Sequence, residues 1–205
     1  MQKGEFMSKI GILGGTFNPI HVGHLILAQY AYEFASLDEV WIMPTGFSYL
    51  KKDDPVPTGE IRLEMVQRAV EDIPYMFPSD VEIKREGCTY TYETLEYLHK
   101  TYPEHEYFFI IGADCLFTME KWKNIQALFD QCTVIAALRG NVSEENMEQK
   151  RLELVNRFQA KIMLMPFKQL DISSTEIRER IKEKKSAKFL IPDGVLQFIQ
   201  EHNLY

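Results

Sequence analysis

The sequence predicts an α/β protein in which helices cover both faces of a doubly wound parallel sheet. Segments with strand-like and helix-like patterns alternate along all 205 residues, which is typical of parallel sheets with helical crossovers. Tyr107–Ile111 is a continuous apolar run and predicts a central strand that is buried on both faces. The chain is long enough for one domain of this class with a sizeable core, and too short for two.

The first half of the chain alternates between strand and helix patterns. Val22–Ala35 is apolar almost all round, which predicts a buried helix. Ile61–Ile73 is amphipathic, with an apolar face made of Ile61, Met65, Val66, Ala69 and Val70. Strands are expected at Ile10–Leu13, Glu39–Met43 and Val81–Arg85, and a further helix at Tyr92–Tyr102, with Leu95 and Leu98 pointing inward. The intervening Pro44–Gly59 has no periodicity, and a loop of this length is more often functional or mobile than idle.

The second half continues the alternation to the last residues. Ser143–Phe158 is rich in charges and is expected to be a surface helix. Besides Tyr107–Ile111, strands are expected at Thr133–Leu138 and Lys161–Met165, and helices at Ile125–Phe129, Ser173–Lys184 and Gly194–His202.

Composition excludes several classes of protein. A net charge of −7 argues against a broad nucleic-acid-binding face, which needs clustered Lys and Arg. Three cysteines without paired spacing (Cys88, Cys115 and Cys132) fit a reducing cytoplasm. No apolar run reaches the roughly 18 residues of a membrane span, and residues 1–6 lack the apolar core of a signal peptide. We therefore expect a cytoplasmic protein with no nucleic-acid or membrane partner, preceded by a disordered upstream extension at residues 1–6.

The most informative segment is Gly11–His24, GILGGTFNPIHVGH. A strand runs into Gly14-Gly15, the chain turns, and His21 and His24 stand where a helix begins. Glycines let the backbone approach an anion, and the free N–H groups of a helix's first turn point at it. The order of these features predicts a site for a nucleoside triphosphate. Taken singly, the glycines are a turn and each histidine is a cap or core residue, whereas a zinc site lacks nearby cysteine partners.

Two later segments carry further candidates. Ser173 and Glu176 have the spacing of a capping box that begins a helix. Ser174 and Arg178 lie on the first turns of this helix, where they can bind phosphates. Phe109–Asp114 is a strand that ends in a Gly-x-Asp turn, where Asp114 can accept hydrogen bonds from a ribose or cap the next segment. Trp122 lies among charged residues, so we expect an incompletely buried indole that can stack on a ligand.

These motifs resemble a known family. Gly14–His24 resembles the signature of the HxGH nucleotidyltransferase superfamily, and Ser173–Arg178 resembles its second signature. The Gly112-Ala113-Asp114 turn, Trp122 and the run Thr89–Leu95 narrow the resemblance to the bacterial nicotinate mononucleotide adenylyltransferases, over nearly the whole chain from Met7. The chain departs from the family pattern in three places. The family has Asp where this chain has Glu93, and often has Asp where this chain has Asn18. The loop before Lys51 lacks the usual prolines and histidine.

The resemblance implies a Rossmann-like fold in a single domain over residues 7–205. It also implies an enzyme that transfers AMP from ATP, carried with Mg²⁺, to nicotinate mononucleotide, giving deamido-NAD and pyrophosphate in NAD biosynthesis. The alternative functions are those of a phosphopantetheine adenylyltransferase and of an inactive nucleotide-binding regulatory module. The sequence leaves open whether the protein forms a homo-oligomer. The resemblance implies that His21, His24 and Arg178 are catalytic. It implies that ATP is bound by Gly14, Gly15, Thr16, His21, His24, Gly112, Asp114, Arg139, Ser174 and Arg178. It implies that the nicotinate nucleotide is bound by Lys51, Thr91 and Trp122.

Overall fold

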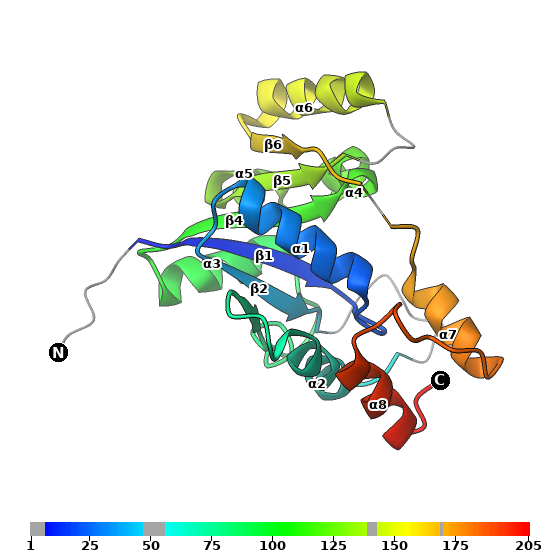
Figure 1. The fold of residues 1–205 in the computed structure, drawn as a ribbon. Helices are drawn as coiled ribbons and strands as arrows, with labels where there is room; N and C mark the ends of the chain where they lie inside the picture. The colour runs from blue at the N-terminus through cyan, green and yellow to red at the C-terminus, as the bar shows by residue number, and fades with distance from the viewer. Residues whose placement is uncertain (1–6, 47–55, 139–142, 169) are drawn as a thin grey trace. The chain divides into compact units, whose positions relative to one another are not determined.

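The computed structural model describes residues 7–46, 56–138, 143–168 and 170–205 (Figure 1). Strands and helices alternate in it, as the sequence predicts. In chain order they are β1 (Lys9–Gly15), α1 (Val22–Phe34), β2 (Glu39–Pro44), α2 (Gly59–Val70), β3 (Met76–Pro78), α3 (Thr91–Thr101), β4 (Glu106–Gly112), α4 (Ala113–Thr118), the 3₁₀ turn η1 (Met119–Lys121), α5 (Ile125–Gln131), β5 (Thr133–Ala137), α6 (Glu144–Phe158), β6 (Lys161–Met165), α7 (Ser174–Lys182) and α8 (Asp193–Glu201). The prediction of residues 1–6 as an extension lies outside the described residues.

The strands form one sheet in the order β3-β2-β1-β4-β5-β6. The pairs β1–β4, β4–β5 and β5–β6 are parallel, with Ile10 opposite Tyr107 and Gly112 opposite Ala137. This order is that of a doubly wound dinucleotide-binding sheet, in which the chain winds outward from the centre in both directions. The α/β, Rossmann-like prediction is confirmed.

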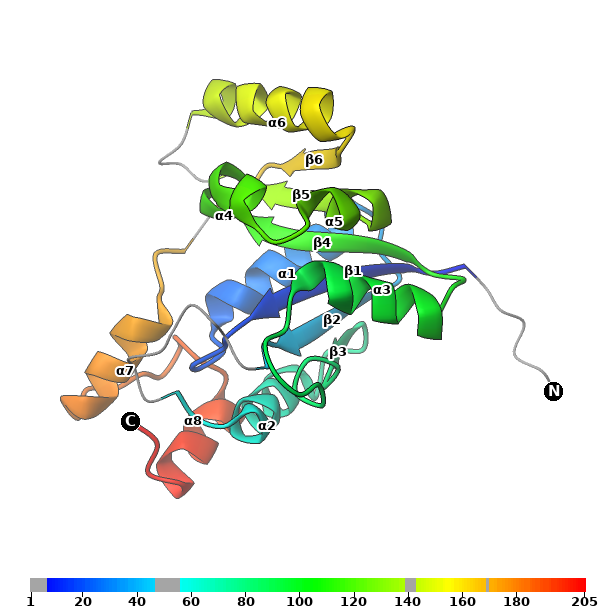
Figure 2. The same cartoon turned by 180° about the vertical axis from the view of Figure 1, so that it is seen from behind.

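The described residues group into two compact units. The first combines β1 up to Leu13, α1 from Ala28, and the part of the chain from Tyr90 to β6. In it β4 is buried throughout Tyr107–Ile111, as expected for a central strand. Helix α1 covers one face of these strands and α3 and α5 the other (Figures 1 and 2). Apolar residues on both faces therefore form its core.

The second unit combines Gly14–Leu27, Trp41–Thr89 and Leu170–Tyr205. Its helices α2 and α8 pack against each other. The predicted apolar face of α2 is confirmed at four buried positions, Met65, Val66, Ala69 and Val70. Helix α8 contributes three buried residues, Val195, Phe198 and Ile199. This unit holds the β1–α1 loop.

Some sequence expectations were wrong. Val81–Arg85 is a turn and not a strand, because the Lys84 N–H bonds to the Asp80 carbonyl at 3.0 Å and their side chains pair at 2.8 Å. The strand of this region is β3 instead. Helix α1 is not buried all round: Ala28 and Ala31 are buried, whereas Tyr30 and Phe34 are each 40% exposed, because the sheet covers one side of the helix.

Candidate functional site

The loop between β1 and α1 is compact, and its residues 17–21 are buried. Phe17 adopts a left-handed backbone conformation (φ 47°) and is 2% exposed. A Cβ on Gly15 would lie 2.9 Å from the Phe17 ring, so glycine is required there. The Val22 N–H, at the start of α1, donates to the Leu190 carbonyl at 3.0 Å. The predicted order of strand, turn and helix start is present, but Gly14 and Gly15 are the last residues of β1 and the turn lies at Asn18-Pro19.

His21 and His24 form a stacked pair where α1 begins. Their ring centroids are 3.7 Å apart with an interplanar angle of 27°, and Phe17 meets the His24 ring edge-on at 5.0 Å. Gly23 permits this arrangement, because a Cβ there would come within 3.0 Å of His21 Nδ1. The spacing of the two histidines around a glycine thus places their rings in one stacked pair.

Hydrogen bonding decides the tautomer of His24. The His21 backbone N–H donates to His24 Nδ1 at 3.2 Å, so Nδ1 accepts and the proton of the neutral ring lies on Nε2. Burial lowers the pKa of His24 to about 3, helped by the charge of His21, and burial lowers the pKa of His21 to about 4. Both rings are therefore neutral near pH 7, and His24 presents an N–H donor at Nε2.

Among the described residues, one polar atom of His21 finds no hydrogen-bond partner. The side chain is 6% exposed, and its Nδ1 is buried with no hydrogen-bond partner within the part of the chain that the structure describes. An unpaired buried polar atom costs about 1–3 kcal/mol. Functional sites are where such a cost is tolerated, because a ligand can supply the missing partner.

Ser174 and Arg178 reach the same loop from α7. The Ser174 hydroxyl donates to the Pro19 carbonyl at 2.9 Å, and an Arg178 Nη donates to the Asn18 carbonyl, also at 2.9 Å. Ser173 caps the helix by accepting from the Glu176 N–H at 3.1 Å, as predicted. The two sequence signatures, about 150 residues apart, are thus joined by direct hydrogen bonds within one compact unit.

Sequence reasoning missed two residues that hold this loop. Arg62 is 4% exposed and donates to the Thr16 carbonyl of this loop at 2.9 Å and to the Thr45 carbonyl, just after β2, at 2.7 Å. The Tyr205 hydroxyl donates to Asn18 Oδ1. A signal existed for Arg62, since it lies three and four residues before Met65 and Val66 on the apolar face of α2. Tyr205 had no sequence signal.

The adenosine-side candidates lie in the first unit, at the end of β4. Gly112 is the last residue of this strand and the N-cap of α4, and Asp114 follows in the first turn of that helix. Gly112 is paired with Ala137, the last residue of β5. The predicted strand end at Gly112 is confirmed, whereas Asp114 stands in a helix and not in a turn, because α4 begins at Ala113 directly after the strand. Arg139 lies outside the described residues.

Two acceptor-side candidates also lie in the first unit. Thr91 is the first residue of α3, one position before the predicted helix start at Tyr92, and Tyr90 before it makes no side-chain cap. Trp122 is half-buried, with its indole edge-on to Phe109 at 6.1 Å, as its charged surroundings suggested. Next to it, the Lys123 ammonium lies 4.0 Å from the centre of the Tyr90 ring. Lys51 lies outside the described residues.

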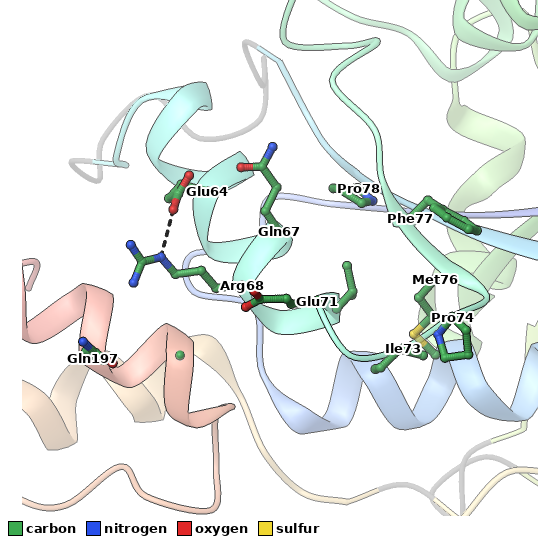
Figure 3. Close-up of a pocket in the computed structure, with 12 residues that line it drawn as sticks. Glu64, Gln67, Arg68, Glu71, Ile73, Pro74, Met76, Phe77, Pro78 and Gln197 are labelled. Carbon is green, nitrogen blue, oxygen red and sulfur yellow. Dashed lines mark hydrogen bonds and ion pairs between the residues drawn. The ribbon is translucent and has the colours of Figure 1, made fainter.

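A separate open groove of about 660 Å³ lies between α2, α8 and the β3 segment (Figure 3). Arg68 lines it and pairs with Glu64 at 2.8 Å. Of the predicted site residues that the structure describes, none is in its lining. Across the described ranges, no three His, Cys, Asp or Glu side chains group as a metal site, and no helix is long and apolar enough to cross a membrane.

Comparison with known proteins gives consistent matches. Residues 12–180 match the family described as cytidylyltransferase-like. A Clostridium perfringens (strain SM101 / Type A) protein named "Probable nicotinate-nucleotide adenylyltransferase" is 39% identical over 199 residues, 97% of this chain and 98% of that protein. A protein of the same name from Lachnoclostridium phytofermentans is 40% identical, over 97% and 100%. The solved structure "Plasmodium falciparum nicotinic acid mononucleotide adenylyltransferase complexed with NaAD" shares the fold, with a TM-score of 0.78, 22% identity and 97% of both chains covered.

Proposed function

The chain belongs to the cytidylyltransferase-like family and, within it, to the nicotinate-nucleotide adenylyltransferases, and we propose that it transfers AMP from ATP to nicotinate mononucleotide. The products are deamido-NAD and pyrophosphate, and the reaction serves NAD biosynthesis. The observation that carries the proposal is the stacked pair of His21 and His24, joined to the second signature through Ser174 and Arg178. Membership in the family supports the choice of nucleotide acceptor.

In this reaction a 5′-phosphate oxygen of the acceptor attacks the α-phosphorus of ATP in line. A new P–O bond forms, the bond from the α-phosphorus to the bridging oxygen breaks, and pyrophosphate leaves with that electron pair. No covalent intermediate with the protein is required, so catalysis rests on positioning and on stabilisation of charge. Neutral His24, with its proton on Nε2, donates a hydrogen bond to oxygens where negative charge develops.

His21 acts beside it on the same triphosphate. Its unpaired Nδ1 finds its partner in the bound nucleotide. A polyphosphate next to these rings favours their charged forms, so ATP binding raises the pKa of both imidazoles from the low values of the free protein. Gly14, Gly15 and Thr16 bring the backbone to the phosphates, and Ser174 and Arg178 act on the outer ones.

The remaining assignments follow the family resemblance residue by residue. Gly112, Asp114 and Arg139 take the adenosine side, and Lys51, Thr91 and Trp122 take the nicotinate nucleotide. Thr91 suits a carboxylate, because it stands at the start of an eleven-residue helix whose dipole favours an anion. Mg²⁺ arrives as part of the substrate, bound to ATP. We place the enzyme in the cytoplasm, in keeping with three cysteines that have no paired spacing in the sequence.

Pyrophosphate release with ATP and a series of acceptors tests the proposal. Nicotinate mononucleotide, nicotinamide mononucleotide and phosphopantetheine are compared under identical conditions. We expect kcat/KM for the acid to exceed that for the amide by at least about tenfold, which corresponds to about 1.4 kcal/mol of differential transition-state binding. Phosphopantetheine should give no release. Equal efficiency with acid and amide would leave a dual-specificity enzyme, and release with phosphopantetheine alone would overturn the proposal.

A further inference from the structure

We infer that the Tyr205 hydroxyl is a positioning group for the loop Thr16–Ile20, which acts through Asn18 and sets the rate of adenylyl transfer more than the affinity for ATP. Its kinetic consequence rests on the proposed function. Its geometric basis lies within the second unit and stands independently of that function.

Asn18 is held through both its side chain and its backbone. It is 6% exposed, its Oδ1 accepts from the Tyr205 hydroxyl, and its carbonyl oxygen accepts from Arg178 at 2.9 Å. Tyr205 and Asn18 are 187 positions apart in the sequence. A buried amide oxygen needs such a donor, because water cannot replace it at low cost.

The Tyr205 phenol is a donor throughout the neutral range. Burial raises its pKa well above its ordinary value of 10.0, although the nearby guanidiniums of Arg178 and Arg62 act in the opposite direction. The phenol therefore keeps its proton and can donate to Asn18 Oδ1. A phenylalanine at this position would keep the ring and its packing and remove only the donated hydrogen bond.

A shift of Asn18 is transmitted directly to the catalytic pair. Asn18 precedes His21 by three residues, and the His21 N–H is the group that orients His24. The other bonds to this loop, from Arg62, Ser174 and Arg178, go to main-chain carbonyls and remain when the Tyr205 hydroxyl is removed. Loss of the hydroxyl should therefore loosen the loop without unfolding the unit, and small displacements of catalytic donors lower turnover.

Steady-state kinetics of Tyr205→Phe test the positioning role. We expect kcat to fall about tenfold, or about 1.4 kcal/mol of barrier, with KM for ATP within about twofold of wild type. Tyr107→Phe is the matched control, because the Tyr107 hydroxyl is also buried and donates to the Leu98 and Tyr102 carbonyls at 3.2 and 3.1 Å, away from this loop. Its kcat should stay within about twofold.

A double-mutant cycle tests whether Tyr205 acts through Asn18. In an Asn18→Ala background, Tyr205→Phe should lower kcat no further, because the acceptor is already absent. Additive effects of the two substitutions, or a wild-type kcat for Tyr205→Phe, would overturn the inference. A rise in KM for ATP with unchanged kcat would also overturn it, since Tyr205 would then contribute to nucleotide binding.

Hydrogen exchange of the free protein separates this inference from the proposed function. The backbone amides of residues 16–21 should exchange at least about fivefold faster in Tyr205→Phe than in wild type, and at the wild-type rate in Tyr107→Phe. Faster exchange in a protein that releases pyrophosphate with none of the acceptors would retain the loop contact and refute the proposed function. Unchanged exchange would refute the positioning role whatever the activity.

Discussion

Replacement of Arg62 by lysine should destabilise the protein far more than a conservative exchange usually does. Arg62 is 4% exposed and its guanidinium donates to four main-chain carbonyls: Pro57 at 3.1 Å, Thr16 at 2.9 Å, Thr45 at 2.7 Å and Gly46 at 3.4 Å. These carbonyls belong to the chain before α2, to the β1–α1 loop and to the segment after β2. A planar fork can reach all of them, whereas an ammonium group donates from a single point.

The magnitude follows from the bonds that lysine cannot make. If the ammonium satisfies two of the four carbonyls, two buried acceptors lose a charged donor, and a hydrogen bond to a charged group is worth about 1.5–3 kcal/mol. The expected loss is therefore about 3–5 kcal/mol in the free energy of unfolding, the range for breaking a buried charged network. For a chain of this size, that lowers the midpoint of thermal unfolding by roughly 10 °C.

Arg68→Lys is the matched control on the same helix. Its side chain is 31% exposed and pairs with Glu64 at 2.8 Å and Glu201 at 3.7 Å, so the same exchange should cost less than about 1 kcal/mol. Thermal unfolding followed by circular dichroism compares both variants with wild type at one pH and salt concentration. Midpoints of Arg62→Lys and Arg68→Lys within about 2 °C of each other would refute the reasoning.

Two further predictions concern the histidine pair. His24→Asn keeps an acceptor at the position of Nδ1 and loses the Nε2 donor, so kcat should fall about 10²-fold or more. His24→Gln can place an amide N–H near the position of Nε2 and should retain more turnover. Equal kcat in the two variants would show that the Nε2 donor does not determine the rate. Because burial lowers the pKa of His21 to about 4 and of His24 to about 3 from 6.5, the unfolded chain binds more protons between these values. The free energy of unfolding should therefore fall as the pH is lowered from about 6.5 towards 4, by on the order of 5 kcal/mol for the two rings together, and His24→Asn should flatten this slope in thermal melts.

The sequence by itself determined most of the fold, because the information is local. The strand Lys161–Met165 has the predicted bounds, and the Ser173 cap is present, since periodicity and cap chemistry depend on neighbouring residues. Tyr107–Ile111 was identifiable as central from its unbroken apolar run. Val81–Arg85 shows the limit: five alternating residues do not reveal whether a partner strand lies beside them, and here a turn forms instead.

The candidate site divides in the same way. The sequence alone singled out His21, His24, Ser174 and Arg178 as candidates, because paired glycines and helix starts leave patterns in adjacent residues. Only the tertiary structure decided that Arg178 donates a hydrogen bond to Asn18, 160 positions away in the sequence. The same holds for the hydrogen bond from Tyr205 to Asn18, which are 187 positions apart. It also decided the tautomer of His24 and the burial of Arg62. Such contacts depend on packing between distant segments, whose side chains carry no local pattern, so the anchoring of the β1–α1 loop is a property of the folded chain.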